Sequence, residues 1–237
     1  AARAEGGRRE RAFCEENFLS SNALRTIADL RQQFAEVLAD AGFVRATRGR
    51  RGADGAIMAG DASNKESSNI RLIRAVICAG LYPNVVRIQN PETTYIEQAA
   101  GAIAQAPKAR ELKLFTQPDG RVFLHPSSVN FQDADYVSPW LVYHDKQATS
   151  KVFIRDSTMV TPYALLLFGG EVTVLHERGE VRVDDWVRLA ASARVGVLLK
   201  GLRGLLDYAM AAKLQDPESD ISSHPAVHAL HALLAFE

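Results

Sequence analysis

Cysteine, net charge and long apolar runs are all scarce in this sequence, and each absence excludes a class of protein. Two cysteines, Cys14 and Cys78, cannot build a disulfide framework or a metal site. Both lie in apolar helical patterns, so we expect buried thiols and a reducing, intracellular location, in the nucleus or the cytoplasm. No apolar run approaches the roughly 20 residues that a membrane helix needs, so no membrane partner is expected.

The charges balance, with 28 Lys and Arg against 28 Asp and Glu. This excludes a uniformly basic protein that coats nucleic acid. It leaves room for a local basic face, because phosphate contacts depend on where the cations lie. Arginines cluster in two stretches, and each stretch fits either phosphate contact or a solvated linker: Arg8, Arg9 and Arg11, and Arg45, Arg48, Arg50 and Arg51.

Motifs for nucleotide hydrolysis and nucleophilic catalysis are also missing. The chain has no Gly-x-x-x-x-Gly-Lys-Ser/Thr loop to cradle phosphates and no Asp-Glu-x-His box. Ser127 lacks the Gly-x-Ser-x-Gly elbow of a serine nucleophile. His224, His228 and His231 have helical spacing, but no cysteine or carboxylate is placed to complete a zinc site. We therefore expect no catalytic residue, metal or cofactor on this chain.

Hydrophobic periodicity predicts helices at both ends of the chain. Ser20 to Asn22 can cap a helix with an apolar face of Leu24, Ile27, Leu30, Phe34, Val37, Leu38 and Ala41. Asn69 can cap a second, with Ile70, Ile73, Val76 and Ile77 on its face. Ser192 can cap a long helix with Val195, Leu198, Leu199, Leu202, Leu205, Leu206 and Ala209 on its face, and a short helix is predicted over 226–236.

Short strands are predicted between these helices. Alternating patterns place them at 85–88, 112–116, 121–125, 140–144 and 152–158, with a helix at 163–168 and a hairpin of 171–176 and 181–189. Pro118-Asp119-Gly120 is typical of a hairpin turn. Residues 1–10 are expected to be disordered, 45–67 to be a mobile loop, and 90–110 to be an insertion in place of a tight loop. Periodicity alone predicts an α+β chain with a small antiparallel sheet.

Two polar stretches on these strands suit a sugar-phosphate backbone, which needs hydrogen-bond donors and a few cations rather than a deep pocket. In the first, Pro126 ends a strand after His125 and exposes Ser127 and Ser128, which fit phosphate or 2′-hydroxyl contact, or a local turn. The second is Thr149-Ser150-Lys151 at a strand start, where the alternative is a solvated strand end.

Aromatic residues on the strands divide between stacking and core positions. Tyr143 and His144 lie on opposite faces of a strand. At most one of them can therefore stack on a base, and we expect one to pack in the core; Tyr143 is included among the candidate contacts. Trp140 and Trp186 are expected in the core.

Several segments together resemble the C-terminal part of the DEAH/RHA-type ATP-dependent RNA helicases. The resemblance rests on Phe13 to Ser20, on Ile73 to Val85, on Leu114 to Asn130, on Trp140 to Lys151 and on Leu165 to Gly170 with Asp184 to Val187. It covers roughly residues 11 to 212, and it is strongest for the branch with the G-quadruplex-resolving and RNA helicase A-like members. It implies a small antiparallel β-barrel of the oligonucleotide/oligosaccharide-binding (OB) fold, flanked by N- and C-terminal helices.

The resemblance also implies a domain plan and a function. Residues 11–69 would be the end of the helical ratchet domain with a mobile loop, 70–190 the OB fold, and 191–237 C-terminal helices. In this family Thr149, Ser150 and Lys151 correspond to residues on the RNA side of the barrel.

Taken together, we expect a fragment that guides single-stranded or structured RNA at the motor exit and that docks on the N-terminal helicase core of the same polypeptide. ATP and Mg²⁺ would be bound by the parent helicase. The alternative is a protein-interaction module that docks on a helicase core or an activator without touching RNA.

Overall fold

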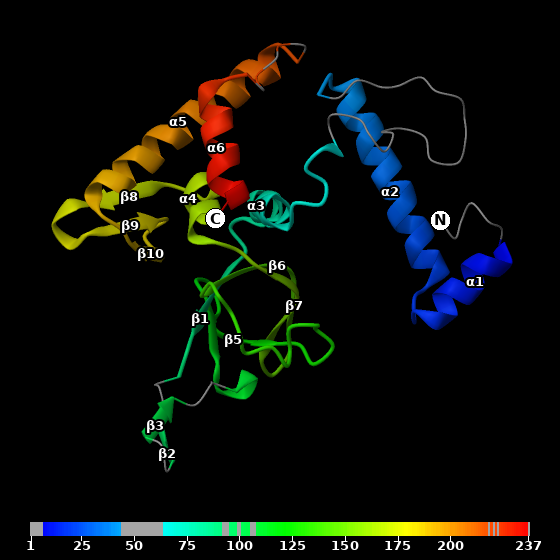
Figure 1. Cartoon of the computed structure of the whole chain (residues 1–237), viewed down its shortest axis with the longest axis horizontal. Helices are drawn as coiled ribbons and strands as arrows, with labels where there is room; N and C mark the ends of the chain where they lie inside the picture. The colour runs from blue at the N-terminus through cyan, green and yellow to red at the C-terminus, as the bar shows by residue number, and fades with distance from the viewer. Residues whose placement is uncertain are drawn as a thin grey trace. The chain divides into compact units, whose positions relative to one another are not determined.

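The computed structural model describes residues 7–43, 64–91, 95–98, 101–104, 108–217, 219, 221 and 223–236. It consists of two compact units (Figure 1). One contains Ala1–Ser68 and Met210–Ile221, and the other contains Asn69–Ala209 and Ser222–Glu237.

The first unit is helical. Helix α1 (Gly7–Glu16) begins inside the stretch expected to be disordered, and Arg25 of α2 (Ser21–Asp40) reaches back to Glu10 with a nitrogen–oxygen distance of 2.9 Å. Ser20 caps α2 as expected, because its side chain accepts a hydrogen bond from the Ala23 N–H. The apolar face of α2 is present but exposed, with only Ala35 buried: Leu24, Ile27, Leu30, Phe34, Val37 and Leu38.

The second unit contains a closed five-stranded barrel in the order β1-β4-β5-β7-β6. The β5–β7 pair is parallel and the other pairs are antiparallel. This barrel and the helices around it confirm the expected α+β class. Its strands are β1 (Val85–Gln89), β4 (Lys113–Thr116), β5 (Gly120–Leu124), β6 (Trp140–Ala148) and β7 (Val152–Met159).

Apolar side chains at alternate positions fill the inside of the barrel. They form one cluster: Val86, Ile88, Leu112, Leu114, Val122, Leu124, Leu141, Tyr143 and Ile154. Because neighbouring residues of a strand point to opposite faces, the residues between them lie on the outside of the barrel. This alternation creates the surface considered below.

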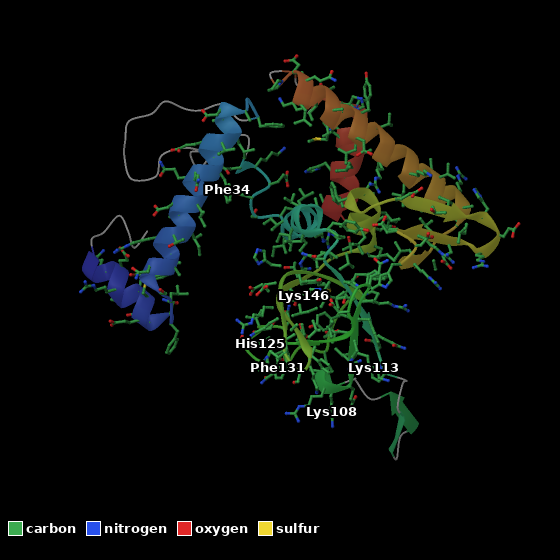
Figure 2. The ribbon with its side chains drawn as sticks, turned by 180° about the vertical axis from the view of Figure 1, so that it is seen from behind. Phe34, Lys108, Lys113, His125, Phe131 and Lys146 are labelled. Carbon is green, nitrogen blue, oxygen red and sulfur yellow. The ribbon has the colours of Figure 1, made fainter. Side chains whose placement is uncertain are left out.

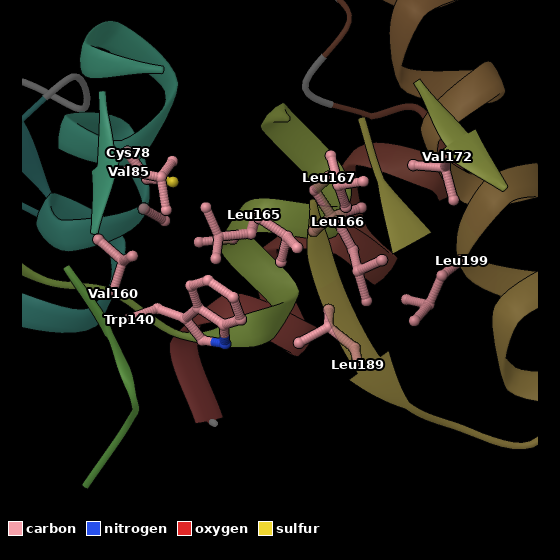
Figure 3. Close-up of a cluster of buried hydrophobic side chains, with 14 of the residues drawn as sticks. Cys78, Val85, Trp140, Val160, Leu165, Leu166, Leu167, Val172, Leu189 and Leu199 are labelled. Atoms are coloured by element: carbon pink, nitrogen blue, oxygen red, sulfur yellow. The ribbon is translucent and has the colours of Figure 1, made fainter. Parts of the chain in front are cut away.

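A second apolar cluster joins one end of the barrel to helices and a small sheet (Figure 3). It contains Cys78 of α3 (Ile70–Leu81), three leucines of α4 (Pro162–Phe168) and Leu199 of α5 (Ala193–Gln215). Helix α6 (Pro225–Phe236) contacts α3, and the sheet has the order β10-β9-β8. Trp140 is buried, as expected for a core residue, whereas Trp186 is partly buried and packs against the cluster, its ring edge-on to Trp140 with the centroids 5.7 Å apart.

Both cysteines are buried and reduced, as expected. The thiol of Cys78 has no exposed surface, and burial raises its pKa to about 12. A thiol of this kind packs as a small apolar group and stays protonated at neutral pH.

Three local predictions differ from the structure. The run expected as one strand at 181–189 forms two strands, β9 (Glu180–Val183) and β10 (Val187–Ala190), which follow β8 (Val172–Leu175). Asp184 and Asp185 adopt left-handed backbone angles and turn the chain between β9 and β10. On α3 the buried residues are Ala75 and Cys78, and three residues of the predicted face are exposed: Ile70, Ile73 and Val76. On α5, Leu198 and Leu205 of the predicted face are exposed as well.

The insertion expected at 90–110 contains a hairpin of β2 (Tyr95–Gln98) and β3 (Gly101–Ala104). The sequence did not predict it, because alanine and glutamine are not typical strand residues. Most of the loop expected at 45–67 lies outside the described residues, and with it the second arginine cluster. In the described part of the chain, no helix is both long and apolar enough to cross a membrane.

Candidate nucleic-acid interface

The outer surface of strands β4, β5 and β7 carries cations and aromatic rings. Leu114, Val122 and Ile154 point into the barrel, so the residues on either side of them point outward. We call this outer surface the β4–β5–β7 face, and it consists of Lys113, Phe115, Arg121, Phe123, His125, Lys151, Phe153 and Arg155. Figure 2 labels Lys113 and His125 among the side chains of the barrel.

Two segments of this face repeat the same pattern of basic residue, phenylalanine and basic residue at every second position. They are Arg121 to His125 and Lys151 to Arg155. The parallel pairing of β5 with β7 sets Phe123 beside Phe153. The two patterns therefore run side by side in register, with basic residues at both ends of an aromatic pair.

Contacts within the face order these side chains. The Phe123 and Phe153 ring centroids are 6.2 Å apart. The Lys151 ammonium lies 4.6 Å from the Phe123 centroid. The Arg121 guanidinium lies 5.6 Å from the Phe115 centroid and 5.2 Å from that of Phe123. These distances are within the range of cation–π attraction, which holds a cation in place without neutralising it.

Two carboxylates at the ends of these strands, Asp119 and Glu111, are engaged in local hydrogen bonds. Asp119 accepts a hydrogen bond from Lys146 at 2.7 Å and another from the Thr116 hydroxyl at 3.1 Å. The Lys146 hydrogen bond lowers the pKa of Asp119, so the carboxylate is ionised and paired. Glu111 accepts a hydrogen bond from the Lys108 N–H at 3.1 Å. Among the described ion pairs, none involves Arg121, Lys151 or Arg155, so the face keeps its positive charge.

The structure places Lys151 of the predicted Thr149-Ser150-Lys151 site on this face. Thr149 is less available, because both its N–H and its hydroxyl donate to the Lys151 carbonyl oxygen, at 2.9 and 3.2 Å. Ser150 is exposed at the same turn. The cation and one hydroxyl of the predicted set are thus open to solvent.

His125 also lies on this face, its ring 5.9 Å from Phe153 and edge-on to it. The Ser127 hydroxyl is 2.7 Å from His125 Nδ1, and the Ser128 hydroxyl accepts from the Asn130 N–H at 3.4 Å. The serines thus make the local contacts that the alternative interpretation anticipated.

Tyr143 belongs to the apolar cluster inside the barrel, where its side chain is 4% exposed. Burial raises the pKa of its hydroxyl, as expected for a group removed from solvent. His144, on the opposite side of the strand, is exposed. Tyr143 therefore meets the expectation that one of the pair packs in the core. Because its side chain lies inside the barrel, it does not form part of the outer surface.

Six residues of the face were not predicted from the sequence: Lys113, Phe115, Arg121, Phe123, Phe153 and Arg155. A signal for them was present in the repeated pattern of basic residue, phenylalanine and basic residue. The pairing that aligns the two copies was not readable, because β5 and β7 are separated by β6 and meet in parallel.

The described residues form no metal site. Within the described ranges, no group of three histidine, cysteine or carboxylate side chains could hold a metal ion. His224 Nδ1 accepts a hydrogen bond from the Ala226 N–H at 3.1 Å, at the start of α6.

Comparison with known families agrees with this architecture. Residues 73–172 match the family described as "Oligonucleotide/oligosaccharide-binding (OB)-fold". Residues 179–235 match the "C-terminal domain in RNA helicases". The barrel and the face described above lie inside the first match, so the expected OB fold is confirmed.

Curated relatives match almost the whole chain. Human DHX57, described as a candidate ATP-dependent RNA helicase, is 44% identical over 234 residues, which is 93% of this chain and 17% of the relative. The human ATP-dependent DNA/RNA helicase DHX36 is 37% identical over 218 residues, 91% of this chain and 19% of the relative. The DExH-box ATP-dependent RNA helicase DExH1 of Arabidopsis thaliana is 34% identical over 221 residues, 92% and 19% respectively. The chain thus spans about a fifth of the length of these relatives.

Proposed function

This chain belongs to the C-terminal, OB-fold-containing region of the DEAH-box RNA helicases, and we propose that it binds single-stranded RNA on its β4–β5–β7 face. The observation that carries the proposal is the alignment of two basic–aromatic–basic patterns by the parallel β5–β7 pair. Bases stack on aromatic rings in a sequence-tolerant way, and phosphates attract the flanking cations.

The spacing of the face fits a flexible strand better than a compact ligand. The rings of Phe115, Phe123 and Phe153 come from three neighbouring strands, and the cations lie among and beside them. A single strand of RNA can lay its bases and phosphates across such a surface.

In the longer proteins to which this region belongs, we propose that an ATP-dependent motor with Mg²⁺ moves RNA past this face. The chain itself holds the emerging strand and hydrolyses nothing. Structured RNA would be bound here only after unwinding, because a duplex hides the faces of its bases.

Lys151→Ala tests the proposal. We expect weak RNA binding, with a dissociation constant in the micromolar range or higher, because the net charge is zero. Removing one phosphate contact should reduce the salt dependence of the affinity by about one counterion and weaken oligo-U and oligo-A alike. Fluorescence anisotropy at several salt concentrations measures both effects.

Lys200→Ala is the matched control, because Lys200 is an exposed lysine of α5 outside the face. It should bind as the unaltered chain does. If Lys151→Ala matches the unaltered chain at every salt concentration while Lys200→Ala weakens binding, the RNA surface is not the β4–β5–β7 face.

A second candidate function is protein–protein docking through α2, whose exposed apolar side favours it. Ile27, Phe34 and Val37 are 61%, 62% and 58% exposed, although they lie on one side of a 20-residue helix. Apolar side chains in such a row gain free energy when a partner covers them. We propose that the upstream helicase portion of the polypeptide is that partner, and this function is compatible with RNA binding on the barrel.

A further inference from the structure

More hydrogen-bond donors point at the imidazole nitrogens of His125 than a neutral ring can accept from. A terminal nitrogen of Arg155 lies 3.0 Å from Nε2. At the other side of the ring, the Ser127 backbone N–H points at Nδ1 at 3.1 Å, and the Ser127 hydroxyl lies 2.7 Å from the same nitrogen.

A guanidinium can only donate, so the Arg155 contact requires an unprotonated Nε2. Neutral imidazole then carries its proton on Nδ1, where it can donate to the Ser127 hydroxyl but cannot accept from the Ser127 N–H. One of the two donors, the Arg155 N–H or the Ser127 backbone N–H, therefore always points at a protonated ring nitrogen, which cannot accept its hydrogen bond. The contact between His125 and Arg155 is a weak resting arrangement, which a better acceptor can replace.

Arg155 itself lacks the acceptors that a half-buried guanidinium normally has. Its Nε is buried and has no hydrogen-bond partner. Asp145 stands opposite Arg155 in the β6–β7 register, yet no ion pair forms between them. The fork of a guanidinium matches two oxygens of one phosphate, and such a contact is stronger than one to a neutral nitrogen.

We propose that Arg155, His125 and Ser127 form a phosphodiester-binding site, and that RNA binding there is coupled to the uptake of one proton by His125. The inference rests on the proposed function and deepens it. A phosphate oxygen accepts from Arg155 and displaces the imidazole. His125 Nε2 then takes a proton from solvent and donates to a second phosphate oxygen, while Nδ1–H donates to the Ser127 hydroxyl. No covalent bond forms or breaks.

Arg155 of β7 is the charged group in contact with the His125 ring, and Asp145 of β6 stands opposite Arg155 in the strand register. The neighbouring charges in the sequence are Asp156, next to Arg155 on β7, and Asp133 and Asp135 in the loop after β5. The Arg155 N–H and a proton on Nε2 cannot both point along the contact that now joins them; a phosphodiester between them offers one oxygen to each donor, and its single negative charge offsets their mutual repulsion.

Affinity measured as a function of pH tests the coupling. The 237-residue chain is titrated into labelled oligo-U, whose bases do not gain protons in this range, from about pH 8 to about pH 5.5 at constant ionic strength, where histidine titrates. We expect binding to tighten as the pH falls, by up to about tenfold per pH unit at the steepest point, because one proton is bound with the RNA.

His125→Asn should remove this pH dependence, because asparagine cannot take up the proton. His176→Asn is the control: His176 is an exposed histidine of the short helix η4 (His176–Arg178), outside the barrel. It should keep the pH dependence. Arg155→Gln should weaken binding throughout, flatten the pH profile and reduce the salt dependence by about one counterion, whereas Arg178→Gln, an exposed arginine outside the face, should do none of these.

Failure of the coupling and failure of the proposed function give different results. If the unaltered chain does not bind oligo-U at any pH, both the proposed RNA binding and this phosphodiester site are overturned. If it binds but His125→Asn keeps the same pH profile, the coupling is overturned and RNA binding stands. Should a variant fail to fold, ¹⁵N NMR of the His125 ring in the unaltered chain decides. We expect oligo-U at about pH 7 to shift the ring to its doubly protonated form, and an unchanged ring would overturn the inference.

Discussion

Arg121 illustrates how one residue of the β4–β5–β7 face is kept charged yet available. Its guanidinium lies against the rings of Phe115 and Phe123 and donates a hydrogen bond to the Leu112 carbonyl oxygen at 3.2 Å. Burial lowers the pKa of Arg121 from its ordinary value, but an arginine stays protonated at physiological pH. A positive charge that is partly dehydrated and fixed in position attracts phosphate more strongly than a fully solvated one.

Asp119 gives a prediction at the same scale. Its pKa lies below the ordinary value of 3.8, first because Lys146 donates a hydrogen bond to it. A carboxyl group with a lowered folded-state pKa stabilises the fold above about pH 5, and this contribution disappears as the pH falls below the unfolded value. The side chains of Lys146 and Asp119 are 39% and 21% exposed, so we expect Asp119→Asn to cost only about 0.5–1 kcal/mol at neutral pH.

Thermal unfolding followed from about pH 7 to about pH 3 measures this effect. The difference in melting temperature between the unaltered chain and Asp119→Asn should shrink as the pH falls. Asp145→Asn, which removes an exposed carboxylate without an ion pair, should show no such trend. A gap between the unaltered chain and Asp119→Asn that stays constant down to pH 3 would be incompatible with the paired carboxylate.

At the scale of elements, local patterns identified most strands and helices, and tertiary contacts decided the rest. The alternations at Val86, Val122 and Ile154 set the inner wall of the barrel, and the caps at Ser20 and Asn69 set two helix starts. The buried side of α3 and the pairing of β5 with β7 were not predictable, because they depend on which distant segment packs alongside. The site followed the same rule: His125 and Lys151 could be predicted from the sequence, but not the register that aligns the strands carrying them.

Gly169 offers a prediction for the packing between α4 and the small sheet. A Cβ at this position would lie 2.3 Å from the Leu165 carbonyl oxygen and 2.6 Å from Val183 Cγ1. Backbone cannot move aside cheaply, so Gly169→Ala should destabilise the fold by about 2 kcal/mol or more. Gly201 in α5 has no atom within 4 Å of its Cβ position, so Gly201→Ala should stabilise by about 0.5–1 kcal/mol.

Urea unfolding followed by the fluorescence of Trp140 and Trp186, which belong to this apolar cluster or pack against it, measures both changes. The two glycine substitutions should have opposite signs. If Gly169→Ala were as stable as the unaltered chain, the close approach of α4 to β9 would be wrong.

For the whole molecule, we propose that the exposed apolar side of α2 is covered by an upstream portion of a longer polypeptide, since the chain spans about a fifth of the length of its relatives. Phe34, labelled in Figure 2, is 62% exposed in this chain. If an upstream portion covers it, Phe34→Ser should change the melting temperature of this chain by no more than about 2 °C. In the longer polypeptide, Phe34→Ser should lower the melting temperature by several times as much, because there the substitution removes a buried ring.

Gln33→Ser, at an exposed position on another side of α2, is the control and should have little effect in either context. Equal, small effects of Phe34→Ser in both contexts would mean that the apolar side of α2 remains uncovered in the longer protein.

The most direct test of the central claim is to map where RNA touches the chain. A 4-thiouridine oligonucleotide, cross-linked by light to the 237-residue chain and analysed by mass spectrometry, reports the contacted peptides. We expect cross-links in the peptides that contain Phe123 and Phe153, and their loss in Arg121→Gln with Lys151→Ala, because the cations hold the strand against the rings. Cross-links confined to α5 and α6, unchanged in that double variant, would contradict RNA binding on the β4–β5–β7 face.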